Sequence, residues 1–87
     1  MITRKEIENT YTVVNGAIRN PGKFEGCPVW AVYFYDLLLD GGADSDDDGV
    51  ATFRITAEDI AEYPELAGAS GVMLREDDSG FIHVACL

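Results

Sequence analysis

The second half of the chain shows the clearest pattern of apolar and polar positions. Residues 50–55 alternate between apolar and polar side chains, as in a strand with one buried face. Two further strand-like runs, 71–75 and 81–87, lie on either side of an Asp-Asp-Ser-Gly loop of hairpin length. The pattern therefore predicts one strand, followed later by a β-hairpin.

A short helix is predicted between these strands, over residues 57–63. Thr56 has the side chain of a helix N-cap, and Asp59 stands at the third helical position, from which its carboxylate can reach back to the cap. Pro64 then ends the helix, because proline has no backbone N–H to donate.

The segment 28–40 allows two interpretations. Its aromatic and β-branched residues favour a strand, but Pro28 suits a first helical position, Gly41 suits a helix end, and thirteen residues is long for a strand. We therefore predict a central buried helix that is apolar nearly all round. Its expected core stripe contains Trp30, Phe34, Leu37 and Leu38, and its other side contains Val29, Tyr33, Asp36 and Asp40.

The first quarter of the chain predicts a helix and a hairpin. A capping box that begins at Thr3 indicates a short helix over residues 4–8. Asn15 and Gly16 form the preferred dipeptide of a two-residue hairpin turn, and they join two short β-rich runs.

Length and composition bound the fold class. A chain of 87 residues can bury one core, and 47% of its residues are hydrophobic, too many for a disordered segment. The elements therefore predict a single α+β domain over residues 1–87 with a mostly antiparallel sheet. We expect Cys27 and Cys86 to be buried thiols, with disulfide or metal use as the alternative.

The length of the hydrophobic runs and the first ten residues predict where the protein is located. No run reaches the length needed to span a bilayer, so we expect no membrane partner. The first ten residues do not resemble a signal peptide, which makes the cytoplasm the expected compartment.

The charge of the chain is regional. Residues 26–87 carry thirteen carboxylates and only two bases, Arg54 and Arg75, whereas residues 1–25 carry three acids and four bases. A field of this sign attracts cations or basic protein surfaces and repels nucleic-acid backbones. The alternative is a housekeeping domain of a halophile, although salt adaptation would be expected to spread the acids along the whole chain.

One acidic loop contains a motif with metal chemistry. Asp44, Asp46 and Asp48 alternate and precede Gly49, which matches the first half of a calcium loop, with oxygen ligands at positions 1, 3 and 5 and glycine at position 6. The match ends at position 12, where Ile55 stands in place of the bidentate glutamate. The segment is thus either a weak calcium site or a solvated acidic loop.

Features typical of catalysis do not accompany these acids. His83 lies in a predicted strand without an evident nucleophile, and the serines sit in polar turns outside any nucleophile motif. Carboxylates in hydrated loops keep ordinary pKa values, which makes them poor general acids. We therefore expect a non-enzymatic protein that does not bind nucleic acid directly and has no cofactor apart from the calcium considered above.

An extended acidic surface is the strongest functional signal. Carboxylates spaced like successive phosphates would compete for protein sites that hold nucleic acid, and an exposed aromatic residue beside them would anchor the interface. The predicted partner-binding residues are Asp36, Asp40, Asp46, Asp47, Asp48, Glu58, Glu62 and Tyr63. The neighbouring acids Asp44, Asp59 and Glu65 would extend this surface.

In its size, its acidity and its lack of catalytic motifs, the chain resembles the small proteins with which phages disable host defences, including anti-CRISPR proteins and DNA mimics. The resemblance is one of composition over the whole chain and involves no shared motif. It implies an inhibitor that occupies the basic surface of a nucleic-acid-handling protein. The alternatives are a calcium-binding domain that uses the partial loop, and the halophile domain.

Overall fold

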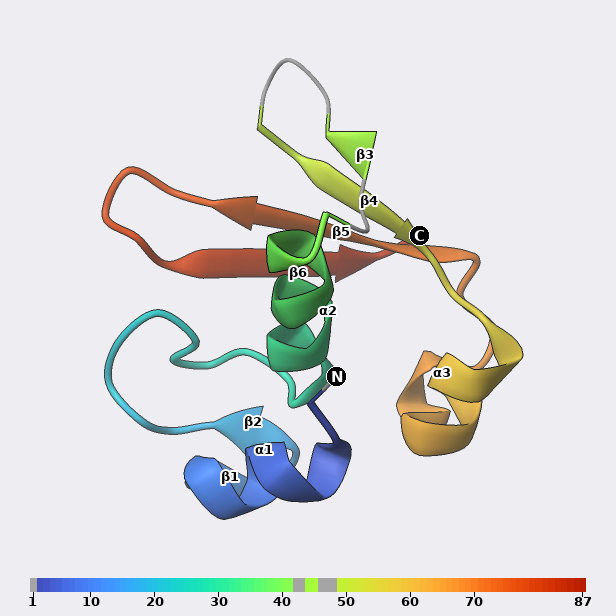
Figure 1. Ribbon diagram of the computed structural model, residues 1–87. Coiled ribbons are helices and arrows are strands. Elements are labelled where there is room, and N and C mark those ends of the chain that lie inside the picture. Colours follow the sequence, from blue (N-terminus) through green and yellow to red (C-terminus); the bar gives the residue numbers. More distant parts are fainter. Residues whose placement is uncertain (1, 42–43, 46–48) are drawn as a thin grey trace.

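The main sheet is an antiparallel meander with the strand order β3-β4-β5-β6 (Figure 1). The computed structural model describes residues 2–41, 44–45 and 49–87. Within these residues the strands are β3 (Asp44–Ser45), β4 (Ala51–Arg54), β5 (Gly71–Glu76) and β6 (Ile82–Cys86). A separate small sheet pairs β1 (Val13–Val14) with β2 (Ala17–Ile18).

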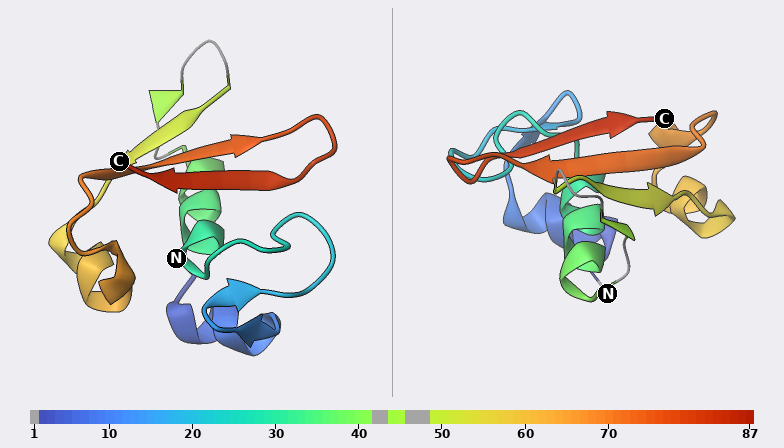
Figure 2. Two further views of the ribbon diagram at one scale, coloured as in Figure 1. Left: turned by 180° about the vertical axis from the view of Figure 1, so that it is seen from behind. Right: turned by 90° about the horizontal axis from the view of Figure 1, so that it is seen from above.

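The helices lie on one side of the main sheet, which we call the helical side. In the described ranges they are α1 (Arg4–Thr10), α2 (Trp30–Leu39) and α3 (Ala57–Glu62), with a 3-10 turn, η1 (Pro64–Leu66), after α3. Views from behind and from above show the strands with no helix on their other side (Figure 2). The predicted α+β fold with a mostly antiparallel sheet is therefore confirmed.

Alternation along the strands assigns each residue to one of two faces, because successive side chains of a strand point in opposite directions. The buried residues of the face toward α2 are Ala51, Phe53, Val72, Leu74 and Ile82. The other face, which we call the open face, consists of Thr52, Arg54, Met73, Arg75, His83 and Ala85. The alternation predicted for 50–55 is present in β4.

The strand predictions are confirmed, but they were incomplete. β5 and β6 form the predicted hairpin, and Asn15 and Gly16 join β1 to β2 with φ values of 53° and 79°, as a type I′ turn requires. β3 was not predicted, since a two-residue strand within an acidic segment has no hydrophobic pattern. It pairs Asp44 with Thr52 and Ser45 with Ala51.

Most of the segment 28–40 is helical, but α2 begins at Trp30 with Val29 as its N-cap, so the prediction of Pro28 as the first helical residue was wrong: Pro28 forms an isolated antiparallel bridge with Ala17. α2 is buried all round in its first half. The predicted core residue Phe34 has its ring 5.1 Å from that of Phe53 in β4. Tyr33, which we expected on the side away from the core, is also buried, because its ring lies 5.3 Å from that of Tyr63. The core therefore continues past α2 on the side away from the sheet. Among the described residues, no helix is both long and apolar enough to cross a bilayer.

The capping box predicted at Thr56 is complete, and the one predicted at Thr3 has only its N-cap hydrogen bond. Oγ1 of Thr56 accepts from the Asp59 N–H at 3.2 Å, while Oδ2 of Asp59 accepts from the Thr56 N–H at 3.0 Å. At the start of α1, Oγ1 of Thr3 accepts from the Glu6 N–H at 3.2 Å. The helix that the first box predicted over 4–8 continues to Thr10.

Candidate binding surfaces

The predicted calcium loop lies partly outside the described residues. Asp46, Asp47 and Asp48 lie outside the described residues. Asp44 begins β3 and is the cross-strand partner of Thr52, which stands at position 9 of the predicted loop. The described part of the chain contains no group of three or more His, Cys, Asp or Glu side chains placed to hold a metal ion. Calcium binding therefore stays a prediction.

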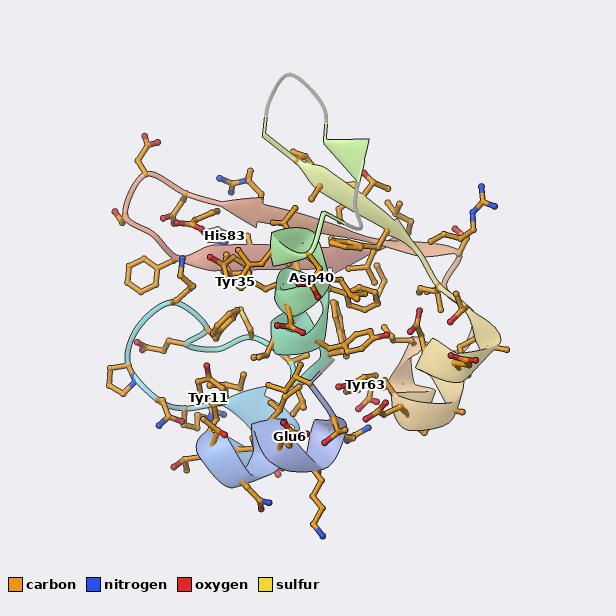
Figure 3. The ribbon with its side chains drawn as sticks, viewed as in Figure 1. Glu6, Tyr11, Tyr35, Asp40, Tyr63 and His83 are labelled. Atoms are coloured by element: carbon orange, nitrogen blue, oxygen red, sulfur yellow. The ribbon has the colours of Figure 1, made fainter. Side chains whose placement is uncertain are left out.

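Tyr63 is not an exposed anchor, so this prediction was wrong. Its side chain is 0% exposed and is among the largest fully buried side chains of the described residues. In Figure 3 it lies between α3 and α2. The sequence suggested exposure because Tyr63 precedes a proline at a helix end, but the chain turns inward there and its ring packs on Tyr33. It belongs to the core.

Arg4 ties α1 to the α3–η1 segment. Its backbone N–H donates to Oε1 of Glu62 at 2.6 Å, and its guanidinium donates to the Glu62 carbonyl at 3.0 Å. The same guanidinium donates to both carboxylate oxygens of Glu65, at 2.8 and 3.1 Å. The hydrogen bond to Glu65 is the main reason why the pKa of Arg4 is raised. Glu62, predicted to bind a partner, is therefore half-buried and already engaged within the protein.

Asp40 and Glu58 are the predicted partner-binding acids that are exposed and free of ion pairs within the described ranges. Asp40 lies at the C-terminal end of α2, where the helix dipole disfavours a negative charge, and Glu58 lies in the first turn of α3. Figure 3 labels Asp40 on α2. Asp36 is half-buried and accepts a long 3.4 Å hydrogen bond from the Ile2 N–H.

The two basic residues of the acidic segment 26–87 both lie on the open face. Arg54 and Arg75, the two bases of residues 26–87, are both exposed there, and neither forms an ion pair with another described residue. The ring of His83 hydrogen-bonds to Oδ2 of Asp77 at 2.8 Å. Beyond residue 25, the helical side therefore presents carboxylates and no base, whereas the open face presents two guanidinium groups that form no ion pair with a described residue.

The sequence analysis did not predict that Arg54 and Arg75 share one face of the sheet, although strand alternation indicates it. Strand alternation already places Arg54 on the same face as Thr52, and Arg75 on the same face as Met73.

Comparisons of the chain with protein-family models, curated proteins and solved structures find no match. The physical description of the surfaces is therefore the basis for a functional proposal.

Proposed function

We propose that this protein is a non-enzymatic binding protein whose acidic helical side occupies a basic surface on a protein partner. The observation that supports the proposal is the sorting of charge across the main sheet among residues 26–87; Arg4 and Lys5 of α1 also lie on the helical side, and Arg4 is paired with Glu65. Asp40 and Glu58 are exposed on the helical side, while both bases of the acidic region lie on the open face. A partner that approaches the helical side therefore meets no repulsive base from residues 26–87.

Exposed carboxylates of this kind are suited to recognition. An exposed charge contributes little to folding stability, so the fold does not constrain its position, which can instead match the charges of a partner. It does accelerate encounter with a surface of opposite charge, and its effect falls as salt rises. The net charge of −10 gives the whole molecule a field that steers such an encounter.

The partner that suits this field best is a protein that handles nucleic acid in the cytoplasm. Surfaces that hold phosphate backbones are rich in lysine and arginine, and a row of carboxylates competes with phosphates for them. The protein would then act as an inhibitor of the phage type that its composition resembles. Its own negative charge disfavours direct binding to nucleic acid.

A pair of double variants with equal net charge tests the proposal. Asp40→Lys with Glu58→Lys reverses two charges of the helical side, while Glu25→Lys with Asp78→Lys reverses two exposed charges elsewhere. Proteins captured from a cell lysate of the natural host at low salt would be identified, and association with the captured partner would be followed by surface plasmon resonance.

We expect the first double variant to associate about tenfold more slowly than the second, because local charge governs steering to one surface. Added salt should also release the wild-type protein from the captured partner. Equal rates for the two double variants would show that only total charge matters, and the helical side would lose its assigned role.

A further inference from the structure

We infer that the outer edge of β6 binds an extended basic segment of a partner protein, which pairs with β6 as an added strand of the main sheet. The inference goes beyond the proposed function, because it rests on the backbone of β6 and does not require the exposed acids of the helical side to bind anything.

The backbone groups of β6 point in two directions. In an antiparallel ladder, every second residue directs its N–H and C=O to the neighbouring strand, and the residues between them direct theirs away. The Leu87 N–H donates to the Gly71 carbonyl at 2.9 Å, and the register between β5 and β6 advances one residue at a time. The residues of β6 that direct their backbone groups away from β5 are therefore Ile82, Val84 and Cys86.

The chain covers the first of these three residues. The Ile82 N–H donates to the Lys23 carbonyl at 2.8 Å, and the Ile82 carbonyl accepts from the thiol of Cys27 at 3.2 Å. Within residues 2–41, 44–45 and 49–87, the outward N–H and C=O groups of Val84 and Cys86 have no hydrogen-bond partner. The edge thus offers two donors and two acceptors to an added strand.

The sequence of β6 does not protect this edge. Proteins usually protect an edge strand with charged side chains, proline or a bulge, but Ile82–Cys86 contains no lysine, arginine, carboxylate or proline. Phe81 and Leu87, at the two ends of β6, are 41% and 52% exposed. Free backbone groups next to exposed apolar side chains are the two components of strand addition.

Charge selects the sequence of the added strand. The net charge of −10 attracts a basic segment and repels an acidic one. Side chains of the added strand would alternate between the two faces of the sheet. Because Arg54 and Arg75 lie on the open face, the lysines or arginines of the added strand belong on the helical side. Its apolar side chains then lie beside Ala85 on the open face.

Two other occupants fit the edge less well. A second copy of this chain could pair its β6 with the first, but each copy carries a net charge of −10, which opposes the pairing. A strand with acidic side chains meets the same repulsion. Both are outcomes that the test below separates from the inferred one.

The test uses the full chain and a ten-residue peptide of alternating lysine and valine. One matched peptide is N-methylated at every peptide bond, which keeps the charge and removes the N–H donors, and another has glutamate in place of lysine. Amide hydrogen exchange, followed by NMR, would locate each peptide, and fluorescence polarisation would measure its Kd. The protein variants are Cys86→Pro, which removes an outward N–H, and Cys86→Ala, which keeps it.

We expect the amides of Val84 and Cys86 to exchange faster than that of Ile82 in the free protein, and the lysine peptide to slow them at least tenfold. Cys86→Pro should weaken its binding about tenfold, while Cys86→Ala leaves the Kd unchanged. If Cys86→Pro does not fold, as circular dichroism would show, the comparison with the N-methylated peptide decides.

Equal binding of the N-methylated peptide would overturn the inference, because charge alone would then explain the affinity. Equal binding of the glutamate peptide, or slowed exchange confined to α2 and α3, would also overturn it. So would slow exchange of Val84 and Cys86 in the free protein, and a dependence of that exchange on protein concentration would identify a second copy as the occupant.

Discussion

The hydroxyl of Tyr33 donates a 2.8 Å hydrogen bond to Oδ1 of Asp59 and so joins α2 to α3 inside the core. The other carboxylate oxygen of Asp59 caps α3 through the Thr56 N–H, so one acid both starts α3 and fixes it to α2. Burial, followed by the contact with Asp59, raises the pKa of Tyr33, which keeps its hydroxyl a donor. Asp59, which we expected in an acidic surface, is only 6% exposed.

The two neighbouring tyrosines should respond differently to the loss of their hydroxyl groups. Tyr33→Phe should lower the free energy of unfolding by about 1 to 3 kcal/mol, because it leaves a buried carboxylate oxygen without its donor. Tyr63→Phe should leave the free energy unchanged or raise it, since the Tyr63 hydroxyl is buried with no hydrogen-bond partner in the described structure. Urea denaturation followed by Trp30 fluorescence measures both. Equal losses would contradict the assigned contacts.

Charge reversal should affect stability differently at Glu58 and at Glu62. Glu62→Lys should cost about 1 to 2 kcal/mol of stability, because it removes the acceptor of the Arg4 N–H and places two positive charges together. Glu58→Lys should change stability by about 0.5 kcal/mol or less, as is usual for an exposed residue. Thermal melts of the two variants would reveal the difference. If Glu62→Lys melted like the wild type, the contact between Arg4 of α1 and Glu62 of α3 would contribute nothing to folding stability.

The two cysteines should differ in reactivity. Cys27 is buried, its thiol donates to the Ile82 carbonyl with Sγ at 3.2 Å, and burial raises its pKa, so its reactive thiolate is scarce. Cys86 is exposed near the end of β6, which corrects our expectation that both thiols are buried. A thiol reagent such as DTNB should label one cysteine quickly in the native protein and the second only after unfolding. Rapid labelling of Cys86→Ser would disprove this.

The charge of Asp77 should stabilise the β5–β6 hairpin in a pH-dependent way. Its carboxylate accepts hydrogen bonds from the His83 ring and from the N–H groups of Phe81 and Ser79, and these contacts, His83 foremost, hold its pKa below the ordinary aspartate value. A lowered folded-state pKa stabilises the protein above the unfolded-state pKa of about 3.9, and the effect disappears as pH falls through the folded-state value.

The stability difference between the wild type and Asp77→Asn should therefore shrink as the pH falls from about 5 to below about 4. Denaturation curves across this range measure it. A difference that stayed constant down to the lowest pH would mean that the charge of Asp77 plays no part in the turn.

The local elements could be predicted because their signals are local. The Thr56 cap, the Asn15-Gly16 turn and the alternation of β4 each depend on residues within a few positions of one another, and all three are present. The existence of a helix within 28–40 also followed from local signals, although α2 begins at Trp30 and not at Pro28, and Gly41 lies just beyond its end.

The candidate site could not be predicted to the same extent, because exposure depends on distant residues. Tyr63 is buried by Tyr33 and by Arg4, whose guanidinium carbon lies 5.4 Å from the centre of its ring. Glu62 is engaged by the same Arg4, which lies 58 residues away in the sequence. No pattern within a short window contains this information. The sequence could therefore identify the candidate acids but not which of them lack contacts with other described residues.

The meander order of the main sheet also has a consequence for the folding rate. Because β4, β5 and β6 are consecutive in the chain and adjacent in space, the β5–β6 pairing closes a short turn, and the β4–β5 pairing closes a loop that contains only α3 and η1, so each loses less chain entropy than a contact across most of the chain. The contact between Arg4 and Glu62 closes a much longer loop, so it would form late. The C-terminal half would then act as the folding nucleus, and substitutions in β5 would slow folding, whereas substitutions at Arg4 would mainly accelerate unfolding.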